Sequence, residues 1–300
     1  MVTRIGGLST GMDIDSLVAK LMKAERMPLE KVMAKQTKND WKRDAYREVN
    51  RNNLAYSQKL FDNYKLEGKW KEEDGSYNVD KLVDKIKQFV SDYNEYTGSV
   101  NKKVNEQSFK DYQPLTDEQR ESMSDKEIEK WEQKAQSGVL RNDNILRQGL
   151  SNLRSSIYEG TSGDFGSLTD LGITTTSNYR DGGQLTIDEK KLREKLKENP
   201  DAVVSLFTSD SGIVSKLREG ISATSRAIEV KSGRDTQTEA QYTMGKESIQ
   251  LKKQIDAWTK RLASKEDQYW KQFTAMEKTI NTMNAQSASL FGGQAVQQGV

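Results

Sequence analysis

The most regular pattern of apolar and polar residues lies near the carboxyl end and predicts one long helix, Lys246 to Leu290. This stretch holds neither glycine nor proline, so nothing in it interrupts a helix. Its apolar residues recur at steps of three and four, with a single step of seven, at Leu251, Ile255, Trp258, Leu262, Tyr269, Phe273, Met276, Ile280 and Met283. Such spacing is typical of a coiled-coil seam, and the long step, filled by Lys265, indicates a stutter that locally unwinds the supercoil.

A helix of this length would extend on the order of 65 Å and could not bury its apolar stripe within one domain. We therefore expect a partner helix, which the other end of the chain provides. Asp13 or Asp15 is a suitable N-cap there. A short apolar stripe follows at Ile14, Leu17, Val18, Leu21 and Met22. Pro28 is expected either to kink this helix or to open the next one at its first position.

A second seam is predicted between Leu29 and Lys65, a stretch without glycine or proline. It passes through Val32, Asn39, Tyr46, Val49, Asn53, Tyr56 and Leu60. Polar seam residues such as Asn39, Lys42 and Asn53 can fix register and partner at a cost in stability. An ordinary solvated helix docked on one side would explain the same pattern, and the sequence leaves both interpretations open.

The middle of the chain predicts shorter elements. A charged connector, residues 66–78, contains Asp74-Gly75, where a tight hairpin between strands could form. Helices are expected over 79–107, 143–158 and 213–228. Two capping boxes, at Thr116 and Ser124, indicate short helices between the first two. A β-hairpin is predicted from 171–179 and 185–187, with its turn at residues 181–183. Asp188 and Pro200 are expected to open two further helices.

These elements predict a mainly α fold, with long terminal helices paired as an antiparallel coiled coil and a helical core domain carrying a small β-hairpin. We assign residues 1–40 with 243–300 to a terminal leg and residues 41–242 to the core. The first half of the last helix is expected to pack against Asp40–Leu60. Its second half, Tyr269–Met283, is expected to pair with Ile14–Met22 and to face neighbouring subunits.

Composition argues against an enzyme. The chain has no histidine and no cysteine, which removes the commonest general base, thiol chemistry and the preferred zinc ligands. Carboxylate pairs such as Glu72-Glu73 are expected by chance among 45 acidic residues. No segment resembles a calcium loop, and Asp181-Gly182-Gly183 is better explained by a turn than by a phosphate cradle. We therefore predict no catalytic residue, no metal and no cofactor.

Charge and hydropathy exclude further classes of protein. Net charge is +2, with both signs interspersed, so no nucleic-acid footprint stands out. No apolar run is long enough to span a membrane, and Met1–Gly7 lacks the apolar region of a signal peptide. The chain is therefore expected to be cytoplasmic or exported without a cleavable signal. Apolar stripes on helices without a local core indicate association, which favours an assembly protein.

Two separated stretches carry a resemblance to a known family. IGGLSTGMDIDSLV, residues 5–18, followed by Leu21-Met22, Glu25 and Pro28-Leu29, resembles the amino terminus of the flagellar hook-associated protein 2 family, the bacterial filament caps. SLTDLGITTTSNYRDGGQLTIDEKKL, residues 167–192, and ENPDAVVSLF, residues 198–207, resemble the signature in that family's carboxyl half. Residues 270–288 have the character of its ending.

The resemblance implies a structural, non-enzymatic cap at the distal end of the flagellar filament that promotes insertion and polymerisation of exported flagellin. It implies a ring-like homo-oligomer, often a pentamer, with terminal helices as legs. The implied partners are flagellin, the hook–filament junction and an export chaperone in the cytoplasm, and export is through the flagellar type III channel. The apolar residues of the seams, with Ile14, Leu17, Val18 and Leu21, are then expected to form the interaction seam.

One departure from the family pattern concerns residues 66–78, where family members usually carry variable β-rich outer domains. The chain is either a naturally short form or one from which these domains have been removed. Plate-like oligomer contacts and adhesion to host surfaces would be expected in the missing part. A hook–filament junction or flagellin-like subunit is an alternative, against which the stretch from Leu168 to Phe207 argues. An adhesin is a further alternative.

Overall fold

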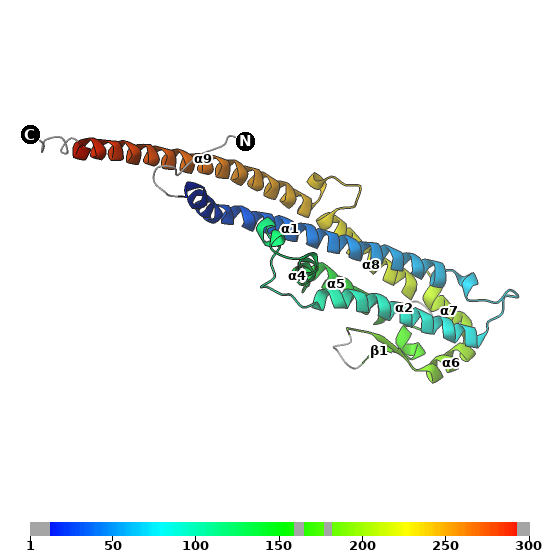
Figure 1. Cartoon of the computed structure of the whole chain (residues 1–300). Helices are drawn as coiled ribbons and strands as arrows, with labels where there is room; N and C mark the ends of the chain where they lie inside the picture. Colours follow the sequence, from blue (N-terminus) through cyan, green and yellow to red (C-terminus); the bar gives the residue numbers. More distant parts are fainter. Residues whose placement is uncertain (1–12, 159–164, 177–181, 293–300) are drawn as a thin grey trace, which may run out of the picture. The chain divides into compact units, whose positions relative to one another are not determined.

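Long helices dominate the computed structural model, which describes residues 13–158, 165–176 and 182–292 (Figure 1). The mainly α prediction is confirmed. The longest helices are the first and the last, α1 (Ile14–Leu60) and α9 (Thr243–Gly292). Between them lie α2 (Val79–Asn105), α3 (Asp117–Glu121), α4 (Asp125–Gln136), α5 (Asn144–Tyr158), α6 (Glu189–Glu198), α7 (Pro200–Thr208) and α8 (Ile213–Ser232). The strands are β1 (Ile173–Thr175) and β2 (Leu185–Ile187).

The chain divides into two compact units. One holds residues 37–249, and the described part of the other holds residues 13–36 and 250–292. The helices α1 and α9 each contribute residues to both units. We refer to residues 37–249 as the core unit and to the other as the terminal-helix unit.

The core unit is built around α2, whose apolar face is buried at Leu82, Ile86, Phe89 and Tyr93. These residues recur every three or four positions, so they line one side of the helix. Helix α2 packs against α5, α6 and β2, while α8 packs against α5 and α7. Each fully buried side chain of this size contributes about 1.5–3 kcal/mol, so the α2 face is a main source of stability for the unit.

The second half of α1 takes its partners from α8 and α2. Asn53 donates from Nδ2 to Ser225 Oγ on α8 over 3.2 Å, and it accepts a 2.8 Å bond from the Tyr96 hydroxyl on α2. Arg47 adds a bond to the carbonyl of Ser232 at the end of α8. The sequence suggested the first half of the last helix as this partner, and that interpretation is wrong. A stripe on one helix shows which face is buried but not which helix covers it.

Pro28 lies inside α1 rather than at the start of a second helix, so one of its two expected placements is wrong. Proline removes a single backbone bond and still has a helical φ, which a long helix packed along its length can accommodate. At its other end α1 continues into one π-helical turn, Phe61–Lys65. The Lys65 ammonium there donates to the carbonyls of Thr208, the last residue of α7, and of Ser209, the residue after it.

The connector after this turn contains a buried tryptophan that its charged sequence did not indicate. Trp70 is 4% exposed, and its indole donates to the Tyr64 carbonyl over 3.1 Å. Its ring lies 4.9 Å from that of Phe207. Beyond it, Glu72 and Ser76 close a turn at Gly75 through a 2.9 Å backbone bond, but no strand flanks them. The hairpin considered at Asp74-Gly75 is therefore a turn only.

The predicted capping residues and the β-hairpin are found in the core unit. Thr116 and Ser124 form capping boxes, Asp188 caps α6, and Pro200 opens α7. The strands β1 and β2 pair antiparallel, with Ile173 opposite Ile187. The predicted turn residue Asp181 lies outside the described residues.

Candidate interaction surface

The terminal-helix unit is a pair of helix segments, the start of α1 and most of α9. Four apolar side chains form its buried centre, Ile14, Val18, Met22 and Leu262. Partly buried apolar residues surround them, Leu29, Tyr269, Trp270 and Phe273. Most of these residues belong to the predicted seams, so the structure brings the Ile14–Met22 stripe together with the second half of the last helix.

A polar contact beside this cluster also joins the two segments. The Tyr269 hydroxyl donates a 2.9 Å hydrogen bond to Glu25. The bond to this carboxylate is the main cause that raises the pKa of Tyr269, because it favours the protonated phenol. In the core unit, Asn39 of α1 donates to the Met244 carbonyl of α9 over 2.9 Å. In each unit a polar bond thus joins α1 to α9.

Several predicted seam residues are core residues of this chain. Tyr46, Val49 and Leu60 belong to the hydrophobic cluster of the core unit, where each is at most 3% exposed. The Tyr46 hydroxyl donates to Asp143, and burial is the main cause that raises the pKa of Tyr46. These three side chains are thus fully used in intramolecular packing.

Other seam residues line the two helices of the terminal-helix unit. Val32, Leu251 and Leu262 are buried, whereas Ile255 and Trp258 are half-buried. The guanidinium of Arg261 lies 4.9 Å from the centroid of the Trp258 ring, an arrangement that suits a cation–π contact. Apolar residues of α9 are therefore buried or half-buried both before and after the predicted stutter.

The apolar surface of this unit extends beyond its buried centre. Leu17 and Leu21, one helical turn apart on α1, are each 38% exposed. On α9, Met276 is 39% and Met283 62% exposed, with the half-buried Ile280 between them. We call these five residues the exposed apolar set. Sequence periodicity placed Leu17 and Leu21 in one stripe with Ile14 and Val18, but helix packing covers only part of that stripe.

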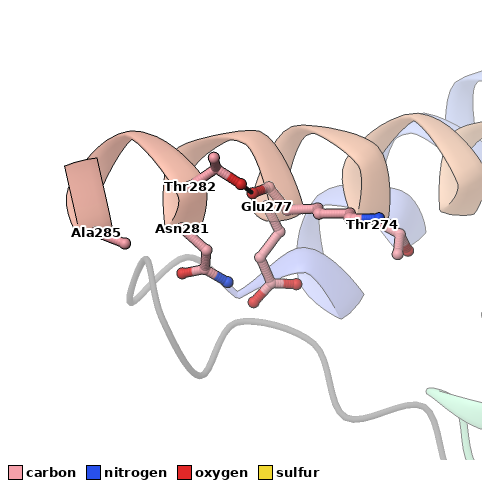
Figure 2. Close-up of a pocket in the computed structure, with 6 residues that line it drawn as sticks. Thr274, Glu277, Asn281, Thr282 and Ala285 are labelled. Atoms are coloured by element: carbon pink, nitrogen blue, oxygen red, sulfur yellow. Dashed lines mark hydrogen bonds between the residues drawn. The ribbon is translucent and has the colours of Figure 1, made fainter.

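A polar face lies next to the methionines on α9. Figure 2 shows Glu277 and Asn281 projecting from the same side of the helix, in a hollow that Thr274 and Ala285 also line. The Thr282 hydroxyl donates to the Lys278 carbonyl over 2.9 Å, a local bond within the helix. The last turns of α9 are thus amphipathic, with methionines on one face and polar residues on a neighbouring face.

Two further findings concern the described residues as a whole. In residues 13–158, 165–176 and 182–292, no three acidic side chains gather in a group that could hold a metal ion. Within the same ranges, no helix combines the length and the apolar character that crossing a membrane requires.

Comparison with known proteins identifies the family. Residues 10–110 match the family model described as flagellar hook-associated protein 2 N-terminus, and residues 67–285 match the model of its C-terminus. The chain belongs to the flagellar hook-associated protein 2 family. The two matches overlap over residues 67–110, so no unmatched stretch separates the amino-terminal and carboxyl-terminal parts of the family pattern.

Three relatives named as hook-associated protein 2 illustrate the similarity. The protein of Halalkalibacterium halodurans is 37% identical over 72% of this chain and 45% of its own length. That of Thermotoga maritima is 29% identical over 70% of this chain and 33% of its own length. The A-type protein of Pseudomonas aeruginosa is 30% identical over 51% of this chain and 30% of its own length. The chain therefore spans less than half the length of these relatives. No significant match to a solved structure was found.

Proposed function

We propose that this chain is a structural cap subunit at the distal end of the bacterial flagellar filament, where it promotes insertion and polymerisation of exported flagellin. Family membership over both the amino- and carboxyl-terminal parts is the observation that carries this proposal. The mechanism would be steric: an oligomer on the tip leaves a gap of one subunit and shifts as each flagellin inserts. No catalytic step is involved.

The terminal-helix unit supports a role as a leg directed toward the filament. We assign residues 1–40 with 243–300 to this leg and residues 41–242 to the core domain. The leg carries the exposed apolar set, and apolar residues that stay accessible on a helix pair are suited to contact another protein. In this proposal Leu17, Leu21, Met276, Ile280 and Met283 contact flagellin or a neighbouring cap subunit, whereas the buried seam residues hold the leg together.

The remaining partners and the route follow from the family. The subunit forms a ring-like homo-oligomer, such as a pentamer, seated beyond the hook–filament junction. An export chaperone binds it in the cytoplasm, and it leaves the cell through the flagellar type III channel without a cleavable signal peptide. The working location is extracellular, at the filament tip.

Imaging of the purified protein with flagellar filaments tests this function. Rings at filament tips are the expected result, together with restored filament growth in a cell that lacks its own cap. Decoration along the filament sides, or growth that is not restored, would contradict a cap role.

The buried polar residues of α1 add a second test. Asn39 and Asn53 both lie in helix interfaces, where polar pairs fix a partner at a cost in stability. We propose that this cost lets α1 rearrange against its partner helices as subunits insert. Replacement of both residues by leucine should slow filament growth in a cap-deleted cell, and unchanged growth would rule out this role.

A further inference from the structure

A second cavity, separate from the exposed apolar set, lies within the core unit. It has a volume of about 500 Å³ and opens between α1 and the loop that joins α2 to α3. Three lysines line it, Lys38 and Lys42 from α1 and Lys110 from the loop. No acidic side chain is among its described lining residues. The cavity is therefore a local positive site on a chain whose charges are otherwise interspersed.

Acidic groups border the cavity without lining it, among them Glu106, which accepts a 3.0 Å bond from the backbone N–H of the lining residue Gly138. The Lys38 ammonium donates to the neutral amide oxygen of Gln113, which cancels no charge. Lys42 lies 3.9 Å from the Asp143 carboxylate, outside the cavity lining. That carboxylate also accepts bonds from the Tyr46 hydroxyl and from the backbone N–H of Ile145 over 3.1 Å. These donors are neutral and cancel none of the Asp143 charge, so Lys42 is ion-paired and the uncompensated charge of the cavity comes from Lys38 and Lys110.

The loops that form part of the cavity wall are held in place by hydrogen bonds. Ser137 Oγ donates to the Gln107 carbonyl over 2.6 Å, and the Trp131 indole donates to the Gln113 carbonyl over 2.7 Å. Gly138 has a φ of +74°, and a Cβ there would lie 2.9 Å from the Ser108 Cβ. A glycine is thus required at this position, because the two loops approach each other closely there. The fold therefore holds the cavity open without a ligand, which lowers the cost of binding.

The aromatic residues around the cavity already have partners. The ring of Tyr112 lies 4.6 Å from that of Trp131. The Lys134 ammonium lies 4.6 Å from the centroid of the Tyr112 ring. Phe109 meets Tyr112 edge to face at 6.1 Å. Single-stranded nucleic acid binds through bases stacked on ring faces, and the contacts of Tyr112 with Trp131, Phe109 and Lys134 leave less of its ring for such stacking. Val139 and Ala135 instead provide an apolar wall beside the lysines.

We propose that this cavity is a docking site for a short acidic peptide segment of a partner protein. The carboxylates of the peptide would pair with Lys38 and Lys110 at the mouth, with Lys42 behind them. An adjacent aliphatic or aromatic side chain would rest on Val139. This inference does not depend on the cap function, because it follows from the charge and shape of the core unit alone.

Fluorescence anisotropy with the full chain tests the proposal. The probe is a labelled peptide of sequence EEFEEL, with the charge-reversed KKFKKL as its control. The acidic peptide should bind, and the basic one should not. The double variant Lys38→Gln with Lys110→Gln should weaken binding roughly tenfold, as expected for the loss of two solvent-accessible ion pairs. Raising the salt from about 0.05 M to about 0.5 M should also weaken it.

Variants that remove equal charge elsewhere distinguish binding at the cavity from a general attraction between the peptide and the positive charges of the chain. Lys190→Gln with Lys197→Gln removes the same charge from α6, where both lysines are exposed and outside the cavity lining. This variant should bind as the unaltered chain does. The single change Lys110→Glu affects an exposed loop side chain and should weaken binding without altering the circular dichroism spectrum.

Three results would overturn the proposal. The first is absence of acidic-peptide binding by a folded chain. The second is an equal loss in the α6 variant, which would indicate attraction to net charge only. The third is displacement of the peptide by inorganic phosphate or by oligothymidylate at least as effectively as by unlabelled peptide. A failure of any kind here leaves the imaging test of the cap unaffected.

Discussion

Tyr269 of α9 donates a 2.9 Å hydrogen bond to Glu25 of α1, although 244 positions separate them in the sequence. It is a polar contact beside the small apolar cluster of Ile14, Val18, Met22 and Leu262. A cluster of this size gives little cooperative stability, so a bond across it is expected to matter for how the two helices stay paired.

This bond predicts an alkaline dependence of helix pairing. The folded-state pKa of Tyr269 is raised above its ordinary value of 10.0. The stabilisation is therefore fully present below pH 10 and is lost as the pH rises through the raised value. A difference titration of tyrosinate absorbance between the unaltered chain and Tyr269→Phe should give a midpoint above 10. A midpoint at or below that value would show that the bond does not form in solution.

Asn53 joins three helices of the core unit, which predicts a large effect of its removal. The change Asn53→Ala leaves the Tyr96 hydroxyl and the Ser225 hydroxyl without their partner in a fully buried position. An unmade buried hydrogen bond costs about 1–3 kcal/mol, and the free energy of unfolding in urea should fall by about that amount. The neighbouring Asn52→Ala, at an exposed position, should change it by less than about 0.5 kcal/mol. Equal effects of the two variants would contradict this role of Asn53.

The burial of Trp70 predicts that the connector depends on this aromatic anchor. Its ring packs against Phe207 and lies 6.4 Å from the ring of Tyr64. The change Trp70→Ala should cost about 3–5 kcal/mol and expose the connector to protease near Gly68 and Gly75. The substitution Trp70→Phe should retain most of the protection. If Trp70→Ala were cleaved no faster than the unaltered chain, the connector would be held by other contacts.

Helix ends were predictable from sequence because their signals are local. The oxygen of Thr116 and the side chain of Gln119 satisfy each other's backbone groups within four residues. The Asp188 side chain likewise accepts a local bond from the backbone N–H of Lys191 at the start of α6. Such bonds form regardless of what the helix later packs against. The existence and type of the helices therefore followed from the pattern.

Partners and exposed positions were not predictable in the same way. Leu17 and Val18 are adjacent and similarly apolar, yet Val18 is 3% exposed and Leu17 38%, because one partner helix covers only part of a broad stripe. The sequence around Asn53 does not indicate that its hydrogen-bond partner is Ser225, which lies 172 positions away. Trp70 stands alone in a charged connector without periodicity, so nothing indicated its burial. The lysine cavity was missed because its residues come from segments far apart in the sequence.

The difference between Leu17 and Val18 gives the sharpest test of the leg surface, and this test rests on the proposed cap function. The double change Leu17→Ser with Leu21→Ser alters side chains that are 38% exposed, so the free energy of unfolding should fall by about 1 kcal/mol for each, less than at a fully buried position. Filament growth in a cap-deleted cell should nevertheless fall sharply, because the proposed contact with flagellin or a neighbouring subunit is lost. Val18→Ser should instead lower stability by about 1–3 kcal/mol, since it places a hydroxyl in the buried cluster.

A control variant distinguishes a specific surface from a general loss of apolar area. Leu54 is 56% exposed on the core unit and lies outside the exposed apolar set. Leu54→Ser should leave both stability and filament length unchanged, whereas Met276→Ser with Met283→Ser should reduce growth as the Leu17 and Leu21 changes do. If filaments of normal length grew with the Leu17 and Leu21 variant present at normal amounts, the start of α1 would not be a contact surface. The leg would then meet its partners through α9 alone.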